Sequence, residues 1–212
     1  MTVARGRAGR PPLTDERKAE IRLRIARAAV GLFVAQGVAA TTGEQIGQAV
    51  GVSARTVWRY FPSKEACVRP LFTAGIEMVA DRLRNWTPGR PLEDVLEPEA
   101  TAELGELVGP DHETVGALVR LTRTEPGLRA VWLQTYDEAE PAFARALAEG
   151  AGLPPDDLRP VVRAAMVNAA LRAAVEHYAR HTAEAGPDRA TAQDELTRIV
   201  RSALAVVAEG LG

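Results

Sequence analysis

The 212-residue sequence is poor in the residues on which many catalytic and disulfide-stabilised proteins depend. Its single cysteine, Cys67, cannot form an internal disulfide, so a reducing cytoplasm is the expected compartment. There are three serines and three histidines, and no nucleophile-elbow, phosphate-loop or paired-cysteine motif accompanies them. These absences argue against an enzyme, and no cofactor is expected.

Long apolar runs are missing as well. The longest are short and interrupted by Arg, Glu or Gln, which argues against a transmembrane segment and a membrane partner. The first twelve residues, MTVARGRAGRPP, are basic but lack the apolar stretch of a secretory signal. Hydrophobic residues nevertheless make up 46% of the chain, which is enough to build a substantial core.

Charge is unevenly distributed along the chain. Residues 1–64 hold 11 basic and 4 acidic residues, whereas residues 65–212 hold 15 and 24. A basic head on an acidic body is typical of nucleic-acid-binding proteins. The alternative is that solvated charges are segregated by chance, and the sequence motifs are needed to choose between the two.

The N-terminal region predicts three helices joined by tight turns. Thr14 can cap a helix whose apolar residues recur at helical spacing until Gly37. Thr42 opens a second, short helix with a capping box, Gly51 ends it, and Ser53 caps a third two residues later. Two helices joined by a short turn that contains glycine are typical of a helix-turn-helix.

The third helix predicts a surface that faces away from the core. Val57 and Phe61 share the side that packs inward, and the two arginines lie together on the opposite side. Arginine can bond both acceptors of guanine, and neighbouring groups can hold phosphates. The residues predicted to face DNA from this helix are Arg55, Thr56, Trp58, Arg59 and Tyr60. A merely solvated face with half-buried aromatic rings is the alternative.

The stretch TTGEQIGQAVGVSARTVWRYFPSKEA resembles the DNA-binding signature of the TetR family of bacterial transcriptional regulators. The matching positions are Thr42, Ile46, Gly51-Val52-Ser53, Thr56-Val57 and Tyr60-Phe61-Pro62-Ser63-Lys64-Glu65. The resemblance covers residues 14 to about 68. It implies an all-α homodimer: a flexible arm (1–13), a three-helix DNA-binding domain (14–66), and a larger helical domain for ligand binding and dimerisation (67–212).

The resemblance also implies roles for single residues. Thr42, at a helix N-terminus, would contact a phosphate, and Lys64 would pair with another. Arg55 stands where the family often has a small residue or proline, so it should add its own base contact. Glu44 stands where some relatives place an arginine that reads bases, so that contact is not expected here. An adaptor that had lost DNA binding would have eroded this signature.

The N-terminal arm offers a further contact with DNA. Arg5, Arg7 and Arg10 alternate with glycine and alanine, and two prolines follow that prevent a helix. The arginines could enter the adjacent minor groove, whose negative potential attracts them. A disordered, solubilising tail is an equally good interpretation.

The next part of the chain predicts further helices. One is expected from Lys64 to Trp86, with a kink at Pro70. Residues 97–111 are expected to form a short helix and a loop, and residues 114–124 another helix.

The C-terminal helices predict a dimer interface. A helix that starts at Pro126 is expected to be interrupted at Pro141. The last two helices, about 156–183 and 188–209, carry alanine and larger apolar residues at helical spacing. Because small residues allow close approach, two copies of this pair could form a four-helix homodimer interface.

A ligand site in the C-terminal domain is predicted only by residue type. The candidates, large or polar groups among many alanines and leucines, are Met78, Trp86, Trp132, Tyr136, Phe143, Met166, Asn168, His177 and Tyr178. Each could equally be core. His177 and His181 have a metal-like spacing, but no third ligand stands near, so no metal site is expected.

Together these features predict a DNA-binding transcriptional regulator. We expect a homodimer that binds a palindromic operator, represses transcription and responds to an unknown small-molecule effector. An activator on the same fold is the alternative, and an enzyme or an adaptor on this fold is much less favoured.

Overall fold

In the computed structural model, the described residues are 14–87, 89–96, 112–154, 156–181 and 189–209, and their regular elements are all helical. The N-terminal elements are α1 (Asp15–Gln36), α2 (Gly43–Val50) and α3 (Ala54–Tyr60). The following elements are η1 (Glu65–Val68), α4 (Arg69–Arg84), η2 (Leu92–Leu96), α6 (His112–Leu121), α7 (Pro126–Ala151), α8 (Leu158–His181) and α9 (Arg189–Glu209). The predicted all-α fold is confirmed.

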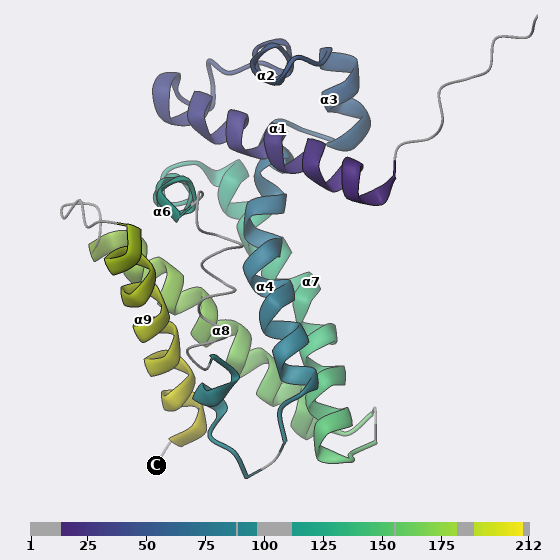
Figure 1. The fold of residues 1–212 in the computed structure, drawn as a ribbon, viewed down its shortest axis with the longest axis vertical. Helices are drawn as coiled ribbons and strands as arrows, with labels where there is room; N and C mark the ends of the chain where they lie inside the picture. The colour runs from purple at the N-terminus through teal and green to yellow at the C-terminus, as the bar shows by residue number, and fades with distance from the viewer. Residues whose placement is uncertain (1–13, 88, 97–111, 155, 182–188, 210–212) are drawn as a thin grey trace, which may run out of the picture.

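The first three helices form a separate group at one end of the molecule, and α4 leads from it into the larger bundle (Figure 1). All three predicted caps are present, with the Thr14, Thr42 and Ser53 side chains accepting backbone N–H groups. Gly51 ends α2 in the left-handed conformation at a φ of 73°, which glycine adopts without steric cost. The tight α2–α3 connection therefore follows from local chemistry.

The core of the N-terminal group fixes the orientation of α3. Phe33 of α1, Ile46 of α2 and Val57 of α3 are all buried within it. Burial of each such side chain contributes about 1.5–3 kcal/mol. Phe61, just after α3, is buried as well. The predicted inward face of α3 is thus the observed one, and the opposite face is free to contact a partner.

Two predictions about proline are wrong. Pro70 does not kink α4 but lies in its first turn, where the missing N–H removes no helical hydrogen bond. Pro141 does not interrupt α7, which continues through it from Pro126 to Ala151. Trp132 and Phe143, on either side of Pro141, are both buried, so packing holds the two halves of α7 in one helix.

The C-terminal bundle is built around α7. This helix packs against α4 on one side and α8 on the other, and α8 packs in turn against α9. The predicted helices at about 156–183 and 188–209 are therefore present as α8 and α9. Both α4 and α6 also contact α1, so they join the bundle to the N-terminal group.

The arm residues and residues 97–111, for which a short helix and a loop were expected, lie outside the described residues. Within the described ranges, none of the helices is both long and apolar enough to cross a membrane.

Candidate DNA-binding surface and internal cavity

Helix α3 presents its two arginines to solvent. Arg55 and Arg59 are both exposed, and Arg55 makes no hydrogen bond or ion pair with the described part of the chain. Other cations of the N-terminal group are engaged: Lys18 pairs with Asp15 at 2.8 Å, and Arg24 donates to a backbone carbonyl at the end of α2 at 2.9 Å. Arg55 is therefore available for a contact with an external acceptor.

Arg59 is held differently, by an aromatic ring. Its guanidinium lies 5.1 Å from the centroid of the Tyr60 ring, and the guanidinium of Arg22 from α1 lies 5.5 Å from the same centroid. Both distances are within the range of cation–π attraction. Tyr60 is half-buried. Because its ring contacts arginines of both helices, it joins α1 to α3 and supports Arg59.

Trp58 lies against the N-terminus of α2. A Cβ atom added at Gly43 would come within 2.0 Å of Cζ2 of the indole, which shows how closely the ring approaches the α2 backbone. The ring remains 43% exposed. Thr42, exposed beside it, completes a capping box with Gln45: its Oγ1 accepts at 3.3 Å and its N–H donates at 2.9 Å. A helix N-terminus edged by a hydroxyl and an indole suits a phosphate.

The side-chain hydroxyls of Thr56 and Ser53 lie together at the start of α3. Their oxygens lie 3.0 Å apart, and the Thr56 N–H donates to the Ser53 oxygen at 3.2 Å. The residues predicted to contact DNA from α3 and the start of α2 are all at least partly exposed. They are Thr42, Arg55, Thr56, Trp58, Arg59 and Tyr60.

Lys64, which was predicted to pair with a phosphate, makes hydrogen bonds within the protein. Its ammonium group donates to the carbonyls of Val38, Ala39 and Thr41, at 2.6, 3.3 and 3.1 Å. An ammonium group has three protons, and the loop between α1 and α2 accepts all three. In this structure Lys64 therefore holds this loop, and its contact with a phosphate stays a prediction.

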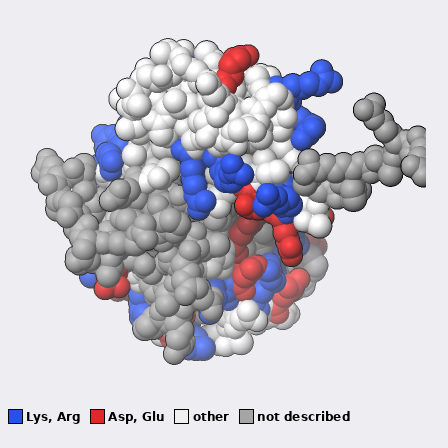
Figure 2. Space-filling model, turned by 45° about the horizontal axis from the view of Figure 1, so that its top comes forward, with Lys and Arg blue, Asp and Glu red and all other residues white. Residues whose placement is uncertain are grey.

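Charge on this part of the molecule is distributed in patches. Figure 2 shows Lys and Arg side chains bordering a largely uncharged surface on the side where the N-terminal group comes forward. The predicted arm contacts, Arg5, Arg7 and Arg10, lie outside the described residues. The described part of this surface therefore offers a few exposed cations, Arg55 and Arg59 among them, more than a broad basic field.

A cavity of about 80 Å³ lies inside the C-terminal bundle, between α4, α6, α7, α8 and α9. Met78, Trp132 and Tyr136, three of the nine ligand candidates, line it. Most of the remaining wall is aliphatic, with Leu71 from α4 and Val200 from α9 as examples. Sequence reasoning missed these residues because an aliphatic cavity wall has the same helical spacing as ordinary core.

The other six candidates lie elsewhere. They are Trp86, Phe143, Met166, Asn168, His177 and Tyr178. The indole N–H of Trp86 donates to the Arg90 carbonyl at 3.2 Å, and the Asn168 amide donates to the Tyr136 carbonyl at 3.0 Å. His177 is exposed, and its ring stacks on that of His181 with 4.0 Å between centroids. Size and polarity singled these residues out, but position in the bundle decides which reach the cavity.

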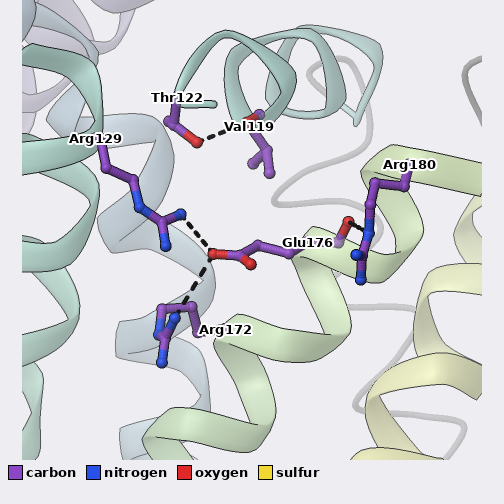
Figure 3. Close-up of polar contacts among 6 residues, drawn as sticks. All are labelled: Val119, Thr122, Arg129, Arg172, Glu176 and Arg180. Carbon is purple, nitrogen blue, oxygen red and sulfur yellow. Dashed lines mark hydrogen bonds and ion pairs between the residues drawn. The ribbon is translucent and has the colours of Figure 1, made fainter. Parts of the chain in front are cut away.

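A charged cluster connects α7 and α8 near the cavity. The Glu176 carboxylate accepts from Arg129 at 2.6 Å and lies 3.7 Å from Arg172, and Figure 3 shows it between the two guanidinium groups. Burial raises the pKa of the nearby Tyr136 hydroxyl well above its ordinary value. Tyr136 is therefore a neutral hydrogen-bonding group at the cavity wall.

Comparisons with known proteins agree with this geometry. Residues 25–71 match the family model described as bacterial regulatory proteins, tetR family, and residues 99–212 match the MftR C-terminal domain. The HTH-type transcriptional regulator TcmR of Streptomyces glaucescens is 36% identical over 157 residues, which cover 71% of this chain and 69% of that protein. The fatty acid degradation regulator FadR from Bacillus halodurans has the same fold, with a TM-score of 0.56 at 20% identity, over 90% of this chain and 95% of that one.

Proposed function

Because this chain belongs to the TetR family of bacterial transcriptional regulators, we propose that it is a repressor that binds a palindromic operator as a homodimer and responds to a small molecule. That it is a DNA-binding transcriptional regulator follows from the family. The family is one of regulators rather than enzymes. A cytoplasmic location, where bacterial DNA lies, is part of this proposal.

The outward pair of arginines on α3 carries the proposal for operator reading. Arg55 is exposed and has no partner among the described residues, and Arg59 is exposed beside Tyr60. A helix with this face fits the major groove, where each guanidinium can bond O6 and N7 of a guanine. In this proposal, Thr42, Thr56 and Trp58 fix the helix against the DNA backbone.

An exposed apolar stripe on α8 supports a homodimer. Leu158 is 70% exposed, and Val162, Ala165 and Ala169 continue outward along the same helical face. Small and apolar side chains exposed in this way allow a second copy to approach closely. In a two-fold dimer, two α3 helices would read half-sites about 34–36 Å apart, or a multiple of that.

The position of the cavity supports control by a small molecule. Its wall includes residues of α4 and α6, and both helices contact α1. A ligand that displaces either helix therefore acts on the N-terminal group and on the separation of the two α3 helices in a dimer. Such a ligand shifts DNA affinity only as far as it binds one arrangement better than the other.

Selection of bound sequences from random DNA is the experiment that tests this function. We expect a palindrome with half-sites at the spacing given above, and lower expression of a reporter placed downstream of it when the protein is present. Recovery of no shared sequence would refute the proposal of a specific operator, and raised expression would make the protein an activator.

Two arginine variants test the assignment of α3. Arg55→Ala and Arg59→Ala should each weaken operator binding about tenfold or more and relax the sequence preference at one base pair per half-site. Arg145→Ala, which removes an exposed arginine of α7, is the matched control and should bind like the wild type. If all three bind with wild-type affinity and preference, α3 does not read the groove.

A further inference from the structure

The indole of Trp132 is fixed at the wall of the cavity. It is 1% exposed, and its ring contacts Phe72 edge-on and Tyr136 at a tilt, with 4.7 Å between centroids in each case. Phe72 and Tyr136 line the same cavity. Contacts on two sides leave the indole little freedom to turn, so the direction of its N–H is set by packing.

This indole N–H is buried without a hydrogen-bond partner among the described residues. Buried polar groups in folded proteins almost always have a partner, so each exception indicates strain or a site that another molecule completes. The Asn168 Oδ1 atom is also buried without a partner, but Asn168 does not line the cavity. Of the two side chains in the described wall that carry an N–H or O–H group, Trp132 and Tyr136, Trp132 is therefore the one whose buried donor lacks an acceptor.

The rest of the wall decides the charge of that molecule. No Asp, Glu, Lys or Arg is among the described residues that line the cavity. The charges that act on Tyr136, at the wall, are those of Arg172 and Glu176 in the cluster of Figure 3, where Glu176 lies between Arg129 and Arg172. An ionised ligand in the cavity would lose its hydration without a counter-charge in the described wall, because neither arginine of the cluster lines it.

We propose that the cavity takes an uncharged, largely apolar ligand that carries a hydrogen-bond acceptor, and that the N–H of Trp132 recognises this acceptor. The inference rests on the proposed function, because it gives the chemistry of the small molecule that controls DNA binding. It makes Trp132 the residue that distinguishes such ligands from plain hydrocarbons of the same shape.

The size of the cavity limits the ligand. An apolar cavity of about 150 Å³ is known to hold benzene, and this one measures about 80 Å³. Met78 forms part of the wall, and an unbranched thioether side chain can change rotamer to enlarge the space. Single-ring ligands are thus the largest probes that a modest enlargement can admit, and Met78 is the side chain expected to move for them.

Three single-ring probes test the proposal by titration calorimetry on the full chain. Acetophenone has a neutral acceptor, ethylbenzene has none, and benzoate is ionised. We expect acetophenone to bind and benzoate to bind more weakly than acetophenone. The ratio of ethylbenzene to acetophenone dissociation constants should fall about three- to tenfold in Trp132→Phe, which keeps an aromatic ring but loses the donor.

Trp86→Phe is the matched control, since the indole N–H of Trp86 donates to a carbonyl outside the cavity. It should leave the ratio unchanged. A second measurement needs no variant of Trp132: in the ¹⁵N-labelled wild type, the Trp132 indole N–H resonance should move downfield with acetophenone but not with ethylbenzene. Trp58→Phe and Trp86→Phe assign the resonances.

Three results would overturn the inference: none of the probes binds, benzoate binds at least as tightly as acetophenone, or the indole resonance responds equally to acetophenone and ethylbenzene. An unchanged ratio in a folded Trp132→Phe variant would overturn it as well. Failure of the proposed function looks different. Acetophenone would then bind as expected, while operator affinity stayed the same with and without it.

Discussion

Replacement of Lys64 by methionine separates a structural role of this residue from a role in DNA binding. In the structure, the ammonium group donates to the carbonyls of Val38, Ala39 and Thr41 in the loop between α1 and α2. Methionine has a similar length but no proton to donate. Lys64→Met therefore leaves three carbonyls without their partner while it preserves most of the packing.

The expected cost is large for one side chain. A hydrogen bond from a charged donor contributes about 1.5–3 kcal/mol, but these bonds share one donor and the side chain is only half-buried. Water can also replace part of what is lost. We therefore expect Lys64→Met to lower the free energy of unfolding by about 2–4 kcal/mol. For a chain of this size, that corresponds to a decrease in Tm of about 4–15 °C.

Urea and thermal unfolding followed by circular dichroism measure this cost. Wild type and variants are compared at one protomer concentration, because the stability of a dimer depends on it. Lys18→Met is the matched control: it removes a surface lysine whose partner, Asp15, has an almost fully exposed side chain. No measurable change in stability is expected for it.

The opposite pattern would refute this reasoning. If Lys64 instead held a phosphate, Lys64→Met would unfold like the wild type. Operator binding would then weaken, and the slope of log affinity against log salt concentration would fall by about 0.9 per subunit. Measurement of the salt slope on the folded variant thus decides between the loop and the phosphate.

Two further experiments test other features of the structure, the position of Trp58 and the burial of Cys67. Gly43→Ala would place Cβ within 2.0 Å of the Trp58 indole, so the ring must move away from α2. We expect the operator affinity, measured by fluorescence anisotropy, to fall several-fold. Wild-type affinity in this variant would show that the position of Trp58 is unimportant for DNA binding. Burial raises the pKa of Cys67 to about 12, so the thiol stays protonated at pH 8. Iodoacetamide should therefore modify it, by intact mass, only after unfolding, and rapid labelling of the native protein would contradict its buried position.

The N-terminal helices could be predicted from sequence because their determinants are local. Thr14, Thr42 and Ser53 each cap through a backbone group three residues away, and Gly51 ends α2 through its own φ. The face of α3 likewise follows from helical periodicity. Nothing distant in the chain has to be known for these conclusions.

The contacts that sequence reasoning missed are between distant residues. Lys64 reaches a loop 23 to 26 residues before it, so its partners could not be inferred from its neighbours. Pro141 breaks helices in isolation, but burial of Trp132 and Phe143 outweighs its local preference here. Pro70 is harmless because α4 begins one residue before it, a boundary set by the preceding turn.

The cavity could be predicted only in part, for a related reason. Met78, Trp132 and Tyr136 stood out by chemical type and do line it. Residues such as Phe143 have the same character but pack into ordinary core. The difference lies in how five helices meet, and periodicity within one helix carries no information about that. The unpartnered N–H of Trp132 became visible only once its surroundings were known.

The contact of Arg59 with Tyr60 has a consequence for the entropy of recognition. A guanidinium already stacked on a ring has fewer rotamers to lose when it meets a base, whereas Arg55 keeps its full freedom until then. The two arginines of α3 should therefore differ in how strictly each specifies the base pair that it contacts. The base pair under Arg59 should be nearly invariant among bound sites, while the one under Arg55 should be specified less strictly, because a mobile side chain can find another acceptor.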